Sequence, residues 1–194
     1  MARPSVADER TRQIVEATIR TIGTHGITGA TLDRIADEAG MSRGHVRHFV
    51  GNREELLRET ARRFYFDGTD ETSILPAGID TVEAAIGWLF GPEFTEPNPD
   101  NAVVFAFVEA SRADAAIADL LVTAYGGTQL RLAQLIAAER PAASRTSCDA
   151  TAYGILTMAL GQAFMNDIQA SPDRTLVARA AAEQLLGSLE TGGS

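Results

Sequence analysis

The chain has 194 residues and a formal net charge of −9, and its 45% hydrophobic and 22% charged residues exclude a disordered protein. No apolar run reaches the roughly 18 residues of a membrane-spanning helix, and the first residues lack the apolar core of a secretory signal, so we expect a cytoplasmic protein without a membrane partner. The single cysteine, Cys148, excludes an internal disulfide, and its surroundings do not suggest a metal site.

The charge is unevenly distributed along the chain. Residues 1–66 hold eleven Arg and nine acidic residues, a net charge of +2, whereas residues 67–194 hold six Arg and seventeen acidic residues, a net charge of −11. All three His lie in the first part, and the chain has no Lys. The acidic remainder argues against non-specific nucleic-acid binding by the whole chain. A local basic face still allows DNA binding, because ionic screening confines its field to about 10 Å.

Four helices are predicted in the first part of the chain. The signals are an apolar residue every three or four positions, a capping side chain at the start and a Gly at the end. Thr31, Ser42 and Asn52 are the expected N-caps of the second, third and fourth helices, and Gly40 ends the second. The predicted helices span about 8–24, 32–39, 43–49 and 53–66.

Five further helices are predicted in the second part, and no convincing pair of strands occurs. The stretch GPEFTEPNPDN carries three prolines and is predicted to be a loop, and Pro141 with the Ser/Thr cluster behind it forms the next linker. Ser171 and Pro172 provide an N-cap and an N1 proline for the last helix. The predicted helices span about 80–90, 102–112, 114–139, 148–169 and 172–189.

The second and third helices form the motif with the clearest chemical meaning. Residues 39–42 join them in a tight turn that contains a Gly, which is typical of a helix-turn-helix whose second helix enters the DNA major groove. Val46, Phe49 and Val50 lie at i, i+3 and i+4 and are expected to face inward. The opposite face then holds Arg43, Gly44, Arg47 and His48, with His45 at its edge.

These residue types suit DNA. Arg forms a bidentate bond to guanine O6 and N7 or to a phosphate, and Gly44 lets the helix backbone approach the groove wall. Thr31 and Arg53 each lie at a helix N-terminus, where free N–H groups also hold phosphate. The alternative is a solvated basic helix in an ordinary bundle. The expected DNA-binding residues are Thr31, Ser42, Arg43, Gly44, His45, Arg47, His48 and Arg53.

The stretch RTRQIVEATIRTIGTHGITGATLDRIADEAGMSRGHV, continued by HFVGNREELL, resembles the TetR family of one-component bacterial transcription regulators. The resemblance covers roughly residues 8–66, and the remainder is similar only in the layout of its helices. It implies that the third helix reads bases, that Thr31 and Arg53 anchor phosphates and that the last two helices dimerise. The matching positions are Gly26, Thr31, Ile35, Ala36, Ala39, Gly40, Ser42, the basic Arg53 and Leu56.

Three positions depart from the usual family pattern. Arg47 stands where the family usually has a Tyr that contacts the DNA backbone, so Arg47 reads either a base or a phosphate. Val50 replaces an aromatic residue at the close of the same helix. Arg53 replaces the common Lys, which keeps the charge and adds a planar fork of donors.

A small-molecule effector site is expected in the second part, where aromatic and Met side chains alternate with polar ones. The resemblance implies such a site, whereas the same spacing also suits an ordinary core. Glu109 either balances a cationic effector or pairs with Arg112 one turn on. The expected ligand-binding residues are Trp88, Phe105, Glu109, Tyr125, Gln129, Gln162 and Met165.

The sequence therefore predicts an all-α protein of about nine helices, with a helix-turn-helix DNA-binding domain at 1–66 and a ligand-binding and dimerisation domain at 67–194. Small residues in AYGILTMALGQAF and apolar stripes in LVARAAAEQLLGSL predict a homodimer through the last two helices, the alternative being a monomer that buries both. Such a dimer would read a pseudo-palindromic, double-stranded operator.

The expected function is that of a transcriptional regulator, most simply a repressor that an effector releases from its operator. The alternatives are a regulator controlled by a protein partner or without a ligand, and an all-helical enzyme. We expect no enzyme, no cofactor and no metal, because no Ser/His/Asp, Cys/His or metal-ligand arrangement is present.

Overall fold

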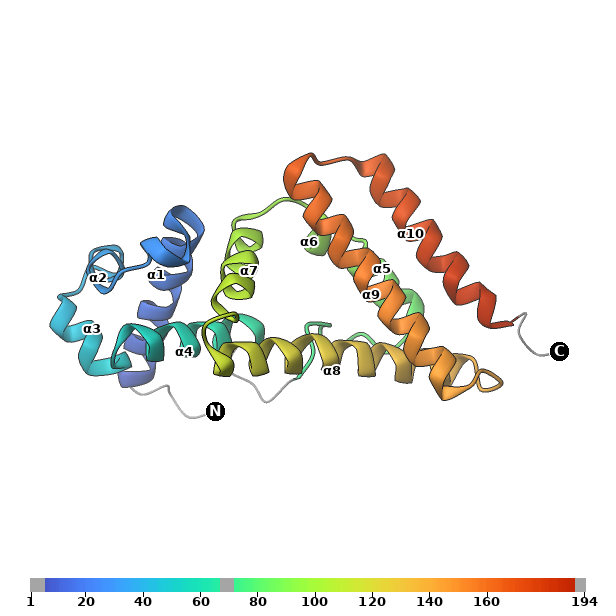
Figure 1. Cartoon of the computed structure of the whole chain (residues 1–194), viewed down its shortest axis with the longest axis horizontal. Coiled ribbons are helices and arrows are strands. Elements are labelled where there is room, and N and C mark those ends of the chain that lie inside the picture. The colour runs from blue at the N-terminus through green and yellow to red at the C-terminus, as the bar shows by residue number, and fades with distance from the viewer. Residues whose placement is uncertain (1–5, 67–71, 191–194) are drawn as a thin grey trace. The chain divides into compact units, whose positions relative to one another are not determined.

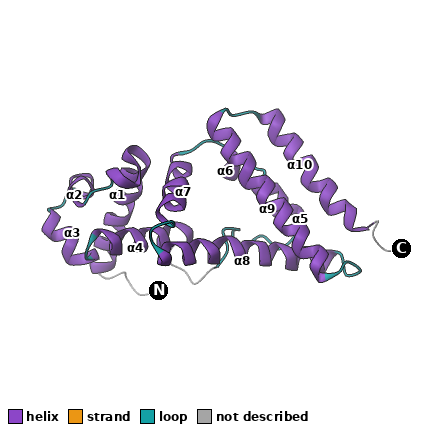
Figure 2. Ribbon diagram, in the orientation of Figure 1, coloured by secondary structure: helices purple, strands orange, loops and turns teal. Residues whose placement is uncertain are grey.

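The computed structural model describes residues 6–66 and 72–190, and within them all regular structure is helical, which confirms the predicted all-α class (Figure 2). Ten α-helices and one short 3-10 helix occur in these residues. The elements are α1 (Val6–Gly29), α2 (Leu32–Ala39), α3 (Arg43–Val50), α4 (Arg53–Phe66), α5 (Val82–Leu89), α6 (Pro92–Thr95), α7 (Pro99–Ala110), α8 (Ala115–Glu139), α9 (Arg145–Ile168), α10 (Pro172–Gly187) and η1 (Ser188–Glu190).

The helices divide into two compact units, which Figure 1 shows in chain colours. Unit 1 contains α1 to α4, α7 and the first turns of α8, up to Val122. Unit 2 contains residues 72–98 and the chain from Thr123 onward, so α8 begins in one unit and ends in the other. The assignment of DNA binding to residues 1–66 and of ligand binding and dimerisation to residues 67–194 stays a prediction.

Unit 1 encloses its own apolar core. Ile14 and Ile22 of α1, Val46 of α3, Leu56 of α4 and Phe107 of α7 are all fully buried or nearly so. α1 packs against α2, α3, α4 and α7, so it is the central helix of the unit. Because α2 and α3 pack on a helix that is itself anchored by α4 and α7, their orientation within the unit is held by buried apolar surface.

Unit 2 has a separate core. Leu89 of α5, Leu132 of α8, Ile155 of α9 and Ala182 of α10 are completely buried in it. α9 and α10 lie side by side and run in opposite directions (Figure 1). A Cβ atom on Gly154 would lie 2.6 Å from a Leu185 methyl carbon, so the small residue is used for close approach of the two helices.

The bounds of α1 and α9 differ from the prediction by several residues. α1 continues to Gly29 although its backbone breaks at Gly26, where φ is 67°. A glycine accepts this left-handed conformation, so a second short helical stretch follows at once. α9 begins at Arg145, three residues before the predicted start, because the Ser144 hydroxyl caps it by accepting from the Ser147 N–H at 3.1 Å.

The predicted loop GPEFTEPNPDN is partly helical, which raises the number of helices from the expected nine. Pro92 begins the one-turn α6, with Gly91 as its N-cap. Pro99 begins α7, three residues before the predicted start. Proline lacks the N–H that a first helical residue leaves unpaired anyway, so both prolines begin helices here instead of preventing them.

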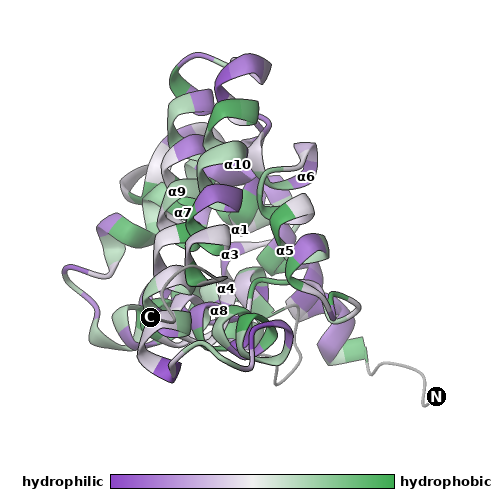
Figure 3. Ribbon diagram, turned by 90° about the vertical axis from the view of Figure 1, so that its right-hand side faces the viewer, coloured by the Kyte–Doolittle hydropathy of each residue, from purple (hydrophilic) through white to green (hydrophobic). Residues whose placement is uncertain are grey.

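α5 is mostly hydrophobic, whereas α10 carries both hydrophobic and hydrophilic residues (Figure 3). Among residues 6–66 and 72–190, no helix combines the length and the apolar character that crossing a membrane requires. The same residues contain no group of three or more His, Cys, Asp or Glu placed to hold a metal ion.

Candidate nucleic-acid interface

The turn between α2 and α3 has the geometry that the sequence predicts. Gly40 adopts the left-handed conformation, with φ 64° and ψ 33°, and its N–H donates to the carbonyls of Ala36 and Asp37. Ser42 then caps α3 by accepting from the His45 N–H at 3.2 Å. Because Gly40 ends one helix and Ser42 begins the next two residues later, α3 leaves α2 at a fixed, tight turn.

One side of α3 is anchored in the core and the other is exposed. Val46 is completely buried, as expected. Phe49 and Val50 are half-buried, so they are less enclosed than Val46. The Phe49 ring contacts the rings of His45 and His48, at centroid distances of 5.0 and 5.1 Å. The exposed residues are Arg43, Gly44, His45, Arg47 and His48.

The two arginines of this face differ in their surroundings. Arg43 Nη1 donates to both carboxylate oxygens of Asp33, at 3.1 and 3.3 Å. Arg47, one turn on, forms no hydrogen bond or ion pair within residues 6–66 and 72–190. Apart from the neighbouring residues and the backbone of α3 itself, no atom of the described residues lies within 4 Å of a Cβ built on Gly44, so the backbone between the two arginines is open.

Thr31 caps α2, as predicted. Its hydroxyl oxygen accepts from the Arg34 N–H at 3.4 Å, and its side chain is exposed. The hydroxyl keeps its own hydrogen for a further acceptor, so the cap and a phosphate contact are compatible. Arg34 itself donates from Nη1 to the Gly29 carbonyl at 3.1 Å.

Arg53 is more enclosed than a free phosphate-binding side chain. Its Nε donates to the Ala30 carbonyl at 2.9 Å, and its Nη2 donates to the Ile27 carbonyl. The guanidinium thereby satisfies two carbonyls near the end of α1. Arg carries five N–H donors, so Nη1 and one N–H of Nη2 are left over for an anion. The sequence carries no local signal for this contact with α1, because Arg53 and the Ala30 carbonyl lie 23 residues apart.

The start of α4 is built as a capping box. Asn52 Oδ1 accepts from the Glu55 N–H at 2.9 Å, and Glu55 Oε2 accepts from the Asn52 N–H at 2.7 Å. Gly51, at φ 74°, precedes the box, and a Cβ there would overlap the Glu55 carboxylate. The Asn-x-x-Glu spacing is the sequence signal for this box, of which the Asn52 cap alone was predicted.

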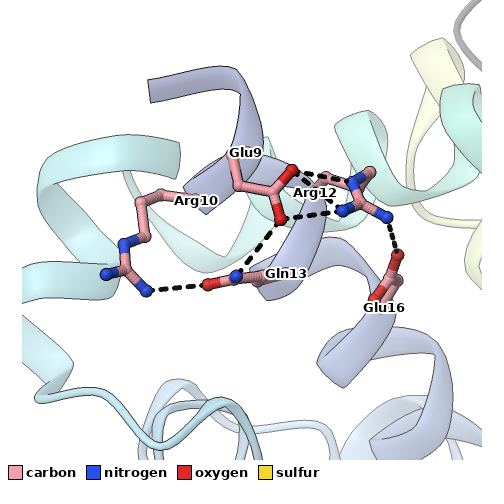
Figure 4. A network of polar contacts seen from close by, with 5 residues as sticks. All are labelled: Glu9, Arg10, Arg12, Gln13 and Glu16. Atoms are coloured by element: carbon pink, nitrogen blue, oxygen red, sulfur yellow. Dashed lines mark hydrogen bonds and ion pairs between the residues drawn. The ribbon is translucent and has the colours of Figure 1, made fainter. Parts of the chain in front are cut away.

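A chain of polar contacts covers the first turns of α1 (Figure 4). Arg12 donates to Glu9 at 2.7 Å and to Glu16 at 3.0 Å. Arg10 donates to the Gln13 side-chain oxygen, and the Gln13 side-chain nitrogen donates to Glu9. The hydrogen bond from Arg12 lowers the pKa of Glu9, and the same bond raises the pKa of Arg12. These ion pairs are exposed and contribute little to stability. Both carboxylate partners of Arg12 lie on α1, the helix that carries Arg12 itself.

The seven residues expected to bind a ligand are divided between the two units. Phe105 and Glu109 belong to unit 1, and the other five belong to unit 2. Trp88 packs against Phe94, and Gln129 donates to Asp149 at 2.9 Å. Phe105 and Met165 are about two-fifths exposed, and Tyr125 is half-buried.

Gln162 belongs to a buried polar network in unit 2. Its Nε2 donates to Asn166 Oδ1 at 2.8 Å and to Thr175 Oγ1 at 3.2 Å. Asn166 Nδ2 in turn donates to the Thr95 carbonyl at 2.9 Å. The network lies beside an open groove of about 490 Å³ that Asn166, Thr175, Phe90 and Leu176 help to line, and none of the seven expected residues lines that groove.

The fold and this face define a class of protein: a helix-turn-helix domain whose second helix presents an exposed basic surface, followed by a further helical unit. Residues 14–60 match the family described as bacterial regulatory proteins, tetR family. The chain is therefore similar to the TetR family over these residues, which contain α2, α3 and most of α1 and α4.

The similarity to individual curated relatives covers only part of the chain. The regulator BetI 1 of Chromohalobacter salexigens is 40% identical over 96 residues, which are 49% of this chain and 48% of the relative. The match therefore spans about half the length of that curated relative.

Two solved structures share the fold over nearly the whole chain. A TetR transcription regulator from Haloarcula marismortui has a TM-score of 0.70 at 19% identity, covering 93% of this chain and 98% of the other. The multidrug binding protein EbrR, solved with proflavin, has a TM-score of 0.56 at 19% identity, covering 91% and 99%.

Proposed function

We propose that the protein is a sequence-specific DNA-binding transcriptional regulator that acts in the cytoplasm as a homodimer, and not an enzyme. The observation that carries the proposal is the α3 face, where Arg43, Arg47 and His48 are exposed while Val46, which lies between the two arginines in the sequence, is completely buried. A helix whose apolar side is buried in the core and whose basic side is exposed can enter the DNA major groove and contact base edges there. Residues 1–66 would then be the DNA-binding part.

Contacts to DNA divide into two kinds in this proposal. Arg43, Arg47, His45 and His48 face the base edges, with Gly44 giving the helix close approach. The helix N-termini at Thr31, Ser42 and Arg53 hold phosphates, since each offers free N–H groups and a donor side chain.

The proposed dimer contact uses α9 and α10. Large apolar side chains are exposed there, with Tyr153 59%, Ile168 67%, Leu176 64% and Val177 70% accessible. Apolar groups this exposed on neighbouring helices favour burial against a second copy, and a two-fold contact closes without exposed ends. The dimer would present two α3 helices about 34 Å apart, the length of one DNA turn.

The proposed control is release from the operator by a small-molecule effector bound in residues 67–194, which makes the protein a repressor. EbrR, which has a similar fold, is a multidrug binding protein solved with proflavin. The seven predicted residues stay the candidate contacts, with the five in unit 2 tested first. Proflavin is the probe for this step, and a concentration-dependent rise in the unfolding temperature is expected if it binds the folded protein.

The experiment that tests DNA binding is fluorescence anisotropy of the full chain on duplexes taken from upstream of its own gene, with random duplexes of equal length as control. We expect tighter binding to one upstream duplex, at two subunits or a multiple per site. Equal binding to all duplexes at every salt concentration would leave only charge-driven, unselective association.

A further inference from the structure

Asp33 and Arg43 meet across the helix-turn-helix. Asp33 lies in the first turn of α2 and Arg43 is the first residue of α3, ten positions later. One nitrogen of Arg43, Nη1, donates to both oxygens of the Asp33 carboxylate, at 3.1 and 3.3 Å. The pair is the only ion pair of the α3 face among the described residues, because neither His45, Arg47 nor His48 has an acidic partner there.

The contact leaves the reading edge of Arg43 free. The Nε–H and both N–H groups of Nη2 have no partner within residues 6–66 and 72–190. Two such parallel donors are what the O6 and N7 acceptors of guanine require. The carboxylate therefore uses one nitrogen of the guanidinium and fixes the plane in which the other donors point.

The same carboxylate selects between the two kinds of acceptor that DNA offers an arginine. A phosphate beside Arg43 would bring a second negative charge close to Asp33, and like charges repel. Guanine O6 and N7 carry no net charge, so Asp33 opposes them much less. The pair is exposed, with side-chain accessibilities of 57% for Arg43 and 66% for Asp33, so water weakens it in the free protein. Exclusion of water in a DNA groove strengthens it.

We infer that Asp33 is a specificity-determining positioning residue, which commits Arg43 to a guanine in the major groove and keeps it from a backbone phosphate. The inference rests on the proposed DNA-binding function. Arg47, which has no such carboxylate, is not restricted in this way. Because of Asp33 on α2, Arg43 is directed to guanine, whereas Arg47 can bind either guanine or a phosphate.

The test compares variants on a panel of duplexes. The starting duplex is the tightest sequence recovered by the wild-type chain from a random pool, and each base pair of one half-site is changed in turn. With Asp33→Asn, we expect the preference at one G·C position to fall about three- to tenfold. Binding to random duplexes should tighten, because one negative charge has been removed.

The matched control is Asp37→Asn. Asp37 lies one turn further along α2, is exposed, and has no side-chain hydrogen bond or ion pair within the described residues. The control removes the same charge from the same helix. We expect it to tighten binding to all duplexes alike and to leave the preference at every position unchanged.

A double-mutant cycle identifies the partner. Arg43→Lys keeps the charge but loses the planar fork, so it should relax the same G·C position that Asp33→Asn relaxes. Adding Asp33→Asn to Arg43→Lys should then change that position little further. Thermal unfolding of each variant checks that folding is retained, as expected for two exposed positions.

Two results would overturn the inference while leaving the proposed function intact. One is an Asp33→Asn variant that behaves like Asp37→Asn, with uniform tightening and unchanged preferences. The other is loss of preference at a position different from the one that Arg43→Lys affects. A wild-type chain that recovers no preferred sequence would instead contradict the proposed function.

Discussion

Arg58 of α4 and Asp114 at the start of α8 form an ion pair of 2.8 Å, and the same carboxylate caps α8. Asp114 Oδ2 accepts from Arg58 Nε, while Oδ1 accepts from the backbone N–H groups of Ala116 and Ile117. Asp114 is only 16% exposed. One side chain therefore joins α4 to the first turn of α8, the helix that continues into unit 2.

Asp114→Ala should destabilise the protein by about 1–2 kcal/mol, because it removes an N-cap together with the partner of Arg58. Asp114→Asn should cost less, since an amide oxygen still caps the helix. Denaturant unfolding of the two variants measures the difference. Equal losses for Ala and Asn would mean that the cap contributes nothing.

Acid should destabilise the protein mainly through the two partly buried carboxylates, Asp114 and Glu59, among the three whose pKa values are lowered. Burial raises the pKa of Asp114 and of Glu59, but hydrogen bonds from Arg58 to Asp114 and from Arg62 and Arg63 to Glu59 outweigh it. The pKa of Glu9 is lowered by Arg12. The stabilisation from these groups is present above the unfolded-state pKa values, about 4, and is lost as the pH falls through the lower folded-state values.

The check is thermal unfolding from pH 7 to pH 3 for the wild type and Asp114→Asn. The variant should begin less stable at pH 7 and lose less on acidification, because one of the carboxylates has been removed. Parallel curves would exclude Asp114 from the acid response.

Arg53 should affect both stability and DNA affinity. Arg53→Ala removes the donors to the Ala30 and Ile27 carbonyls, which should cost about 1–2 kcal/mol of stability. It should also lower the dependence of log affinity on log salt by about one. Arg53→Lys keeps the charge, so it should keep the salt dependence and lose part of the stability. If the salt dependence of Arg53→Ala is unchanged, Arg53 does not contact a phosphate and serves only to hold the end of α1.

A charge placed on the exposed face of α10 should separate the proposed dimer. Leu176→Glu and Val177→Glu each put a carboxylate where a large apolar side chain is 64% or 70% exposed. Light scattering should show a monomer, and operator affinity should fall because one half-site no longer helps the other. The control is Val122→Glu on α8, 73% exposed and outside α9 and α10. Monomers from all three variants, or from none, would contradict the assignment.

The parts of the fold that could be predicted are those that depend on near neighbours in sequence. The caps at Thr31, Ser42 and Ser171 and the left-handed Gly40 follow from short-range hydrogen bonds and backbone sterics, and all were predicted. The start of α7 was placed too late, because proline was interpreted as a loop signal although it also suits the first helical position.

The relationships within the site that were missed depend on tertiary packing. Arg53 lies 23 residues from the Ala30 carbonyl that it binds, and Arg43 lies ten residues from Asp33. No periodicity relates such pairs. The candidate ligand residues were chosen by residue type on predicted helices, and that choice cannot anticipate that Phe105 and Glu109 belong to the unit formed by α1–α4 and α7.

The most direct test of the central claim is selection of binding sequences from a random duplex pool by the full-length protein, followed by sequencing of the recovered DNA. A dimer that reads DNA with α3 predicts an inverted repeat whose half-sites are centred about 10 base pairs, or a multiple, apart, with a G·C pair at the position that Arg43 reads. Recovery of unenriched sequences, or of a single half-site without a repeat, would contradict a dimeric, sequence-specific regulator.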